Sequence, residues 1–112
     1  MLSSRIAAEL VDTPPSELDP AALASRARAM LEELPGVQLE EIVGPSLLEH
    51  GLQGIHHVGQ AARSAPRLLV ATWDPGNAPH HVALVGKGVT FDTGGLHVKA
   101  RGMMEGMKAD MG

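Results

Sequence analysis

Cysteine is absent from the 112-residue sequence, which excludes a disulfide framework and any thiolate metal ligand. A metal bound by this chain must therefore use oxygen or nitrogen ligands. Aromatic side chains are scarce, with one Trp, one Phe and no Tyr, so the core must be built from aliphatic residues and Met. Acidic residues outnumber basic ones by 13 to 9, and no basic stripe runs along the chain. We therefore expect no nucleic-acid partner.

Long hydrophobic runs are also missing. No apolar stretch approaches the roughly 20 residues that a membrane-spanning helix needs, and residues 1–10 lack the apolar segment of a secretory signal. We therefore expect no membrane partner and a cytoplasmic location. The composition, 44% hydrophobic and 20% charged, is typical of a globular chain, and the length suits one small domain.

Helical patterns dominate the first third of the chain. Apolar spacing predicts a short helix over residues 4–11, which Pro14-Pro15 ends because tandem prolines cannot continue a helix. Asp19-Pro20 then combines an N-cap residue with proline at the first helical position. Apolar residues follow at helical spacing until Pro35-Gly36, which predicts a second helix between these two signals.

Strand patterns follow. Residues 37–43 predict a strand, and residues 45–50 predict one or two helical turns closed by Gly51. Residues 54–63 are compatible with either a loop or a helix start. Unbroken apolar runs at 68–73 and 82–85 are typical of strands buried on both faces. Together these patterns predict an α/β fold in which helices pack on a mixed, mostly buried sheet.

Charged residues gather among glycines in the last part of the chain. Lys87 and Asp92 follow the apolar run at 82–85, and Lys99 and Asp110 come after them. The ends of buried strands in α/β sheets are where sites collect. Carboxylates and amines converging there, without cysteine, indicate a hard-cation or anion site. The alternative is that each Lys pairs with an Asp in a purely structural ion pair, and the spacing leaves both interpretations open.

The same stretch resembles the M17 family of leucyl aminopeptidases. Its residues 85–95 read VGKGVTFDTGG, a Lys follows at position 99, and residues 107–112 read MKADMG, all at the spacing of the family motif. Residues 10–20, LVDTPPSELDP, and residues 54–73, GIHHVGQAARSAPRLLVATW, are also similar to family elements. The resemblance implies that residues 1–112 are the front part of a peptidase catalytic domain. Because a Met-rich segment stops without a polar tail, we expect the chain to be truncated.

The resemblance also implies roles for five residues. Asp92 would bridge two divalent ions, manganese or zinc, and Lys87 and Asp110 would complete one of the two metal sites. Lys99 would lie near the scissile carbonyl and stabilise the tetrahedral intermediate. Met107 would line the pocket for the N-terminal side chain of a peptide substrate. Family members are usually hexamers, so self-association is expected of an intact protein.

Two departures from the family pattern limit this interpretation. His97, Val98 and Ala100 stand where Ser, a small apolar residue and Pro are more usual, which makes a leucine preference doubtful. The family's second block, Asn-Thr-Asp-Ala-Glu-Gly-Arg, does not occur in this chain, so the chain by itself should lack a complete second metal site. We therefore expect a metal-dependent aminopeptidase fragment that is inactive alone. The alternative is a non-catalytic remnant or interaction module that retains at most one metal.

The remaining His, Met and Glu residues indicate no functional site. The six His residues form no metal-binding pattern and are interpreted as surface or loop residues. Met103, Met104 and Met111 are interpreted as packing residues. The acidic pairs Glu32-Glu33 and Glu40-Glu41 are interpreted as solvated faces.

Overall fold

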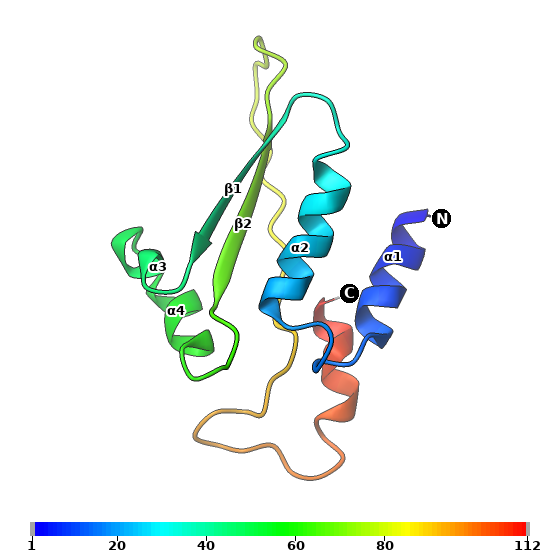
Figure 1. Cartoon of the computed structure of the whole chain (residues 1–112), viewed down its shortest axis with the longest axis vertical. Helices are drawn as coiled ribbons and strands as arrows, with labels where there is room; N and C mark the ends of the chain where they lie inside the picture. The colour runs from blue at the N-terminus through cyan, green and yellow to red at the C-terminus, as the bar shows by residue number, and fades with distance from the viewer. Residues whose placement is uncertain (1, 112) are drawn as a thin grey trace. The chain divides into compact units, whose positions relative to one another are not determined.

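The computed structural model describes residues 2–111. Its elements follow the order α1 (Leu2–Asp12), α2 (Pro20–Leu31), β1 (Val37–Val43), α3 (Ser46–Glu49), α4 (Gln53–Gly59), β2 (Arg67–Trp73) and the 3₁₀ helix η1 (Glu105–Met111) (Figure 1). The chain divides into two compact units. One, here called the terminal unit, joins the residues up to Asp19 with those from Val85 onward, and the other, the central unit, is Pro20–Leu84.

The central unit is built on the pair β1 and β2. These strands run antiparallel, with Val37 opposite Trp73 at one end and Val43 opposite Arg67 at the other. Helix α2 contacts both strands, and α3 and α4 contact β1 and β2 respectively. Figure 1 shows α2 running beside the strand pair. Leu47 of α3 is fully buried and Ala24 of α2 is 6% exposed, so the core of this unit lies between the helices and the strands.

The terminal unit combines α1, the turn that follows it, and residues from 85 onward. Helix α1 ends where Pro14 and Pro15 remove backbone donors, and the Leu18 N–H donates to the Pro14 carbonyl over 2.8 Å. That turn buries Leu18 completely, and Thr90 is 7% exposed. Helix η1 contacts α1. The contact of α1 with η1 thus joins the N-terminal residues to the segment that carries Lys87, Asp92, Lys99 and Asp110.

Most predicted elements are confirmed. The helix over residues 4–11 corresponds to α1, the helix beginning at Pro20 to α2, and the strand over 37–43 to β1 with the same bounds. The turns over 45–50 correspond to α3, and Gly51 follows with φ +73° as a left-handed terminator. Residues 54–63, for which the sequence is compatible with a loop or a helix start, are helical at their start, within α4. The α/β fold class is therefore confirmed.

The observed sheet differs from the predicted one in its strands and in their burial. In residues 2–111 it has two strands, both antiparallel, so it is not mixed. Residues 82–85 form no strand, and Val82, Leu84 and Val85 are 85%, 94% and 95% exposed. A strand exists only when a neighbour completes its hydrogen bonds, and no described segment pairs with these residues. Strand β2 is half-buried at its start and exposed over its last three residues, so it is not buried on both faces.

None of the helices described between residues 2 and 111 combines the length and the apolar character that a membrane span requires.

Candidate metal and substrate site

Two ion pairs gather the charged residues of the terminal unit. The Lys87 Nζ donates to Asp110 Oδ2 over 2.9 Å, which joins the segment after residue 85 to η1. The Lys99 Nζ donates to Asp92 Oδ2 over 2.8 Å. The side chains of Lys87, Asp92 and Asp110 are about half exposed, whereas that of Lys99 is 20% exposed. The site is therefore an open cluster of carboxylates and amines.

A tight loop holds the pair formed by Asp92 and Lys99. The Gly94 N–H donates to Asp92 Oδ1 over 2.7 Å, and the Lys99 N–H donates to the Thr93 carbonyl over 2.8 Å. Gly94 has φ +98°, a left-handed conformation that favours glycine. A Cβ at this position would collide with the His97 carbonyl oxygen. The glycine that follows Asp92 thus lets the chain turn tightly enough to return Lys99 to the carboxylate.

The electrostatics of the cluster favour the charged form of Asp92. The hydrogen bond from the Lys99 ammonium, followed by that from the Gly94 N–H, holds the pKa of Asp92 below its ordinary value. The positive charge of Lys87 acts on Asp92 in the same direction, so Lys87 lies near enough to belong to the same cluster. Asp92 is therefore ionised at neutral pH and is available as an acceptor for cationic groups.

Helix η1 presents two of the expected site residues together. In a 3₁₀ helix, side chains at i and i+3 eclipse one another, so Met107 and Asp110 share a face. Met107 is half-buried, and Asp110 is 56% exposed on its side chain. The structure therefore brings Met107 to the same side of η1 as the pair formed by Lys87 and Asp110.

The donor set suits part of a metal centre. Carboxylate oxygens, such as those of Asp92 and Asp110, are ligands that manganese and zinc accept. The Nζ atoms of Lys87 and Lys99 lie within 3 Å of these oxygens, so positive charge is favoured at both places. No group of three His, Cys, Asp or Glu side chains lies together within residues 2–111. Structural and catalytic zinc sites usually take at least three protein ligands. These residues therefore fit a metal ion as a partial donor set.

One methionine and two histidines outside the cluster have surroundings that bear on their predicted roles. Met103 is 56% exposed, so its interpretation as a packing residue is wrong, whereas Met104 and Met111 are half-buried. The Nδ1 atoms of His50 and His56 lie 2.9 and 3.2 Å from the carbonyls of Ser46 and Gly44. These two histidines therefore lie against local backbone groups.

Comparison with known proteins places these features in a family. The model of the cytosol aminopeptidase family, catalytic domain, matches residues 5–112. A probable cytosol aminopeptidase of Leifsonia xyli is 45% identical over 92% of this chain and 21% of its own length. Leucine aminopeptidase 1 of Caenorhabditis elegans is 41% identical over 98% of this chain and 22% of its own length.

Solved structures of leucyl aminopeptidases are also similar to this chain. The leucyl aminopeptidase of Trypanosoma brucei, in complex with actinonin, matches 97% of this chain with a TM-score of 0.86 and 40% identity. The apo enzyme of Trypanosoma cruzi matches 91% with a TM-score of 0.82 and 43% identity. The chain spans about a fifth of the length of these relatives. It belongs to the cytosol aminopeptidase family, and the matched region is part of the catalytic domain.

Proposed function

We propose that this chain supplies metal-binding and substrate-binding residues to a metal-dependent aminopeptidase that hydrolyses the N-terminal peptide bond of peptides. One observation carries the proposal. Residues 23 positions apart, Lys87 and Asp110, meet at 2.9 Å beside the pair formed by Asp92 and Lys99. The relatives named leucine or leucyl aminopeptidase support the reaction class. A hexameric assembly and a cytoplasmic location remain predictions for the intact protein.

The roles of the residues follow from their chemistry. Asp92 and Asp110 would hold divalent cations, manganese or zinc, together with the amine of Lys87. When bound, such ions supply Lewis acidity toward a peptide carbonyl. Lys99 would turn its ammonium from Asp92 toward the carbonyl oxygen and donate a hydrogen bond as negative charge develops there. Met107 would contact the N-terminal side chain of the peptide from the same face of η1 as Asp110.

A manganese titration of this chain tests the metal role. We expect manganese to raise the thermal midpoint of the chain, because a ligand that binds only the folded state stabilises it. Asp92→Asn and Asp110→Asn should abolish the rise, since each removes a charged oxygen donor. Glu40→Gln in the central unit is the matched control and should leave the rise intact. A midpoint that manganese leaves unchanged in the unsubstituted chain would refute the metal role.

The catalytic role needs the remainder of a catalytic domain. In a chimera, this chain replaces the matched 103 residues of the Leifsonia xyli relative. We expect the chimera to hydrolyse leucine anilide and Lys99→Met to lower kcat by about 100-fold or more, as for loss of an oxyanion donor. Manganese should still raise the midpoint of Lys99→Met. Unchanged kcat in this variant would remove Lys99 from the reaction.

A second candidate has its own supporting observation. The ion pairs of Lys87 with Asp110 and of Lys99 with Asp92 would hold the fold without taking part in a reaction, as expected of a non-catalytic remnant or interaction module that retains at most one metal. For such a module, manganese can still raise the midpoint, but the chimera does not hydrolyse leucine anilide. Hydrolysis by the chimera therefore separates the two functions.

A further inference from the structure

Both carboxylate oxygens of Asp92 accept a hydrogen bond from the same loop. Oδ1 accepts from the Gly94 N–H over 2.7 Å, and Oδ2 accepts from the Lys99 Nζ over 2.8 Å. The first donor belongs to the backbone of a crowded glycine turn, so it has little freedom to leave. The second donor ends a flexible side chain of four methylene groups, which can rotate away while the backbone stays in place. Lys99 is therefore the donor that can leave the carboxylate of Asp92.

The Lys99 ammonium and a divalent ion would repel each other at this carboxylate. A zinc ion lies about 2.0 to 2.2 Å from a carboxylate oxygen that it binds. An ion on Asp92 Oδ2 could therefore lie no more than about 5 Å from the Lys99 Nζ, provided that the ion pair stays intact. The Lys99 side chain is 20% exposed, so solvent screens this repulsion less than at an open surface. Binding of the ion thus competes with the ion pair.

The second lysine of the cluster has a different relation to the proposed metal site. Lys87 donates to Asp110 Oδ2 over 2.9 Å, and both side chains are more than half exposed. In the proposed function, the amine of Lys87 is itself a ligand, so the ion gains a donor from this residue. Lys99 contributes no ligand and only occupies an oxygen of Asp92. The two lysines should therefore affect metal affinity in opposite directions.

We propose that Lys99 is a built-in competitor of the divalent ion at Asp92 and is released from this carboxylate when the ion binds. The inference rests on the proposed function, because it concerns the same metal site. Its consequence is regulatory. Asp92 holds the Lys99 ammonium until an ion displaces it, so Lys99 becomes free to reach a substrate carbonyl only in a chain that has bound the ion.

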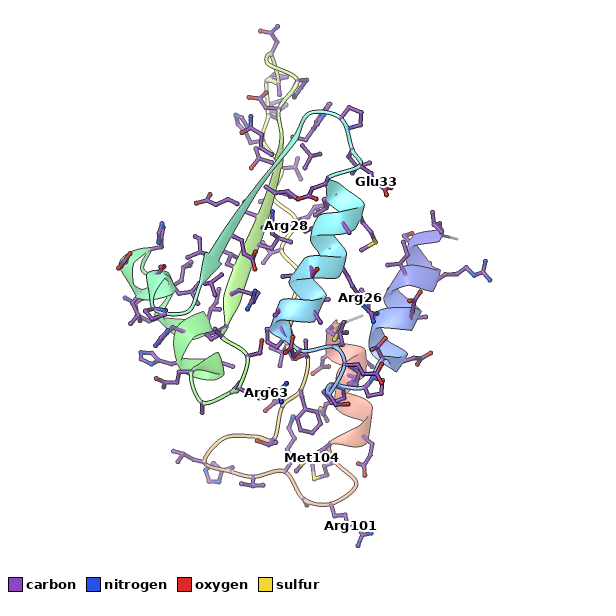
Figure 2. The ribbon with its side chains drawn as sticks, in the orientation of Figure 1. Arg26, Arg28, Glu33, Arg63, Arg101 and Met104 are labelled. Carbon is purple, nitrogen blue, oxygen red and sulfur yellow. The ribbon has the colours of Figure 1, made fainter. Side chains whose placement is uncertain are left out.

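Opposite shifts in metal affinity test the competition. We expect Lys99→Met to lower the dissociation constant for manganese by about 3- to 10-fold, since the ion no longer displaces an ion pair. Lys87→Met should raise this constant, because a ligand is lost. Arg101→Met removes the same charge at an exposed position of the same unit (Figure 2) and should change it by less than about twofold. Isothermal titration calorimetry of this chain and its three variants measures the constants.

Chemical labelling of the unsubstituted chain follows the release of Lys99 directly. An N-hydroxysuccinimide ester acylates accessible lysines, and mass spectrometry resolves the rate at each position. Saturating manganese should speed the labelling of Lys99, whose Nζ leaves Asp92, and slow that of Lys87, whose amine binds the ion. This measurement requires no substitution, so it tests the release even where Lys99→Met does not fold.

Two results would overturn the competition and leave the metal role of Asp92 standing. One is a dissociation constant for Lys99→Met that differs from that of the unsubstituted chain no more than the constant for Arg101→Met does. The other is labelling of Lys99 that manganese binding does not speed. Absence of manganese binding from both the unsubstituted chain and Lys99→Met has a different meaning, since it removes the metal role itself and the competition with it.

Discussion

Glu41 shows at the scale of a single residue how the central unit is held together. Its Oε1 accepts from Arg67 Nη1 over 2.8 Å, and its Oε2 accepts from Arg28 Nη2 over 2.9 Å. The carboxylate thus ties β1 to β2 and to α2, and Figure 2 shows Arg28 reaching from α2 toward the strands. The side chains of Glu41 and Arg67 are each 19% exposed, so solvent screens this pair less than a surface pair.

Substitution of Glu41 should therefore destabilise the central unit. We expect Glu41→Gln to lower the free energy of unfolding by about 1 to 3 kcal/mol, because hydrogen bonds between charged groups are lost and two guanidinium groups lose a counter-charge. Glu40→Gln, at an exposed neighbour on the same strand, should stay within about 0.5 kcal/mol. Urea unfolding measures both. Equal losses of unfolding free energy in Glu41→Gln and Glu40→Gln would show that Arg28 and Arg67 do not stabilise the folded chain through Glu41.

The same carboxylate predicts a dependence on pH. The hydrogen bond from Arg28, followed by that from Arg67, lowers the pKa of Glu41 in the folded protein. A lowered carboxyl pKa contributes stability that is fully present above the unfolded value of about 4.3 and is lost as the pH falls through the folded value. The difference in unfolding free energy between the unsubstituted chain and Glu41→Gln should therefore be largest near pH 7 and shrink below about pH 4. A difference that stays constant from pH 7 to pH 3 would contradict this assignment.

At the scale of an element, the loop from Asp92 to Lys99 depends on one glycine for its shape. Gly94 and Gly95 both have positive φ, +98° and +72°, but only Gly94 is crowded. We expect Gly95→Ala to lower stability by about 1 kcal/mol through backbone conformation alone. Gly94→Ala should lower it further and also abolish the rise in midpoint with manganese, because the collision with the His97 carbonyl displaces the Gly94 N–H that holds the Asp92 carboxylate in place. If both variants keep that rise, the loop does not position the site.

Strands show what sequence patterns can and cannot predict here. Strand β1 was predictable to the residue, because Pro35-Gly36 and Gly44-Pro45 bound an apolar pattern on both sides. Residues 82–85 have a stronger apolar pattern but form no strand, since strand formation depends on a neighbour that the pattern does not contain. Burial of Glu41 was also missed, because its arginine partners lie 13 and 26 residues away.

The exposed run at 82–85 allows a test of whether this segment lacks a packing partner. Leu84 is 94% exposed, so Leu84→Lys should leave the thermal midpoint of this chain within a degree while reducing aggregation measured by light scattering. Leu69→Lys, at a half-buried position of β2, should lower the midpoint by several degrees, since it places a charge against the core of the central unit. A large drop with Leu84→Lys would mean that this segment packs in solution.

At the scale of the molecule, the site belongs to one of two units. Lys87, Asp92, Lys99 and Asp110 all lie in the terminal unit, and the triad of Arg28, Glu41 and Arg67 lies in the central unit. The sequence placed the four charged residues in one stretch but left open whether they bind a cation or pair with one another. The structure shows how they pair, because contacts between residues 7 and 23 positions apart depend on the loop and on η1.

This division predicts where a metal ion should change local stability. Binding raises the free energy of opening only for structure that must be intact to hold the ion. With saturating manganese, we expect amide hydrogen exchange to slow from Val89 to Met111 and in α1, which contacts η1, and to stay unchanged in β1 and β2. Exchange measured by mass spectrometry resolves these segments. Asp110→Asn supplies the control, since it should remove the slowing without altering exchange in the central unit. Slowing confined to β1 and β2 would place the metal ion elsewhere, whereas equal slowing throughout would show that the two units open together.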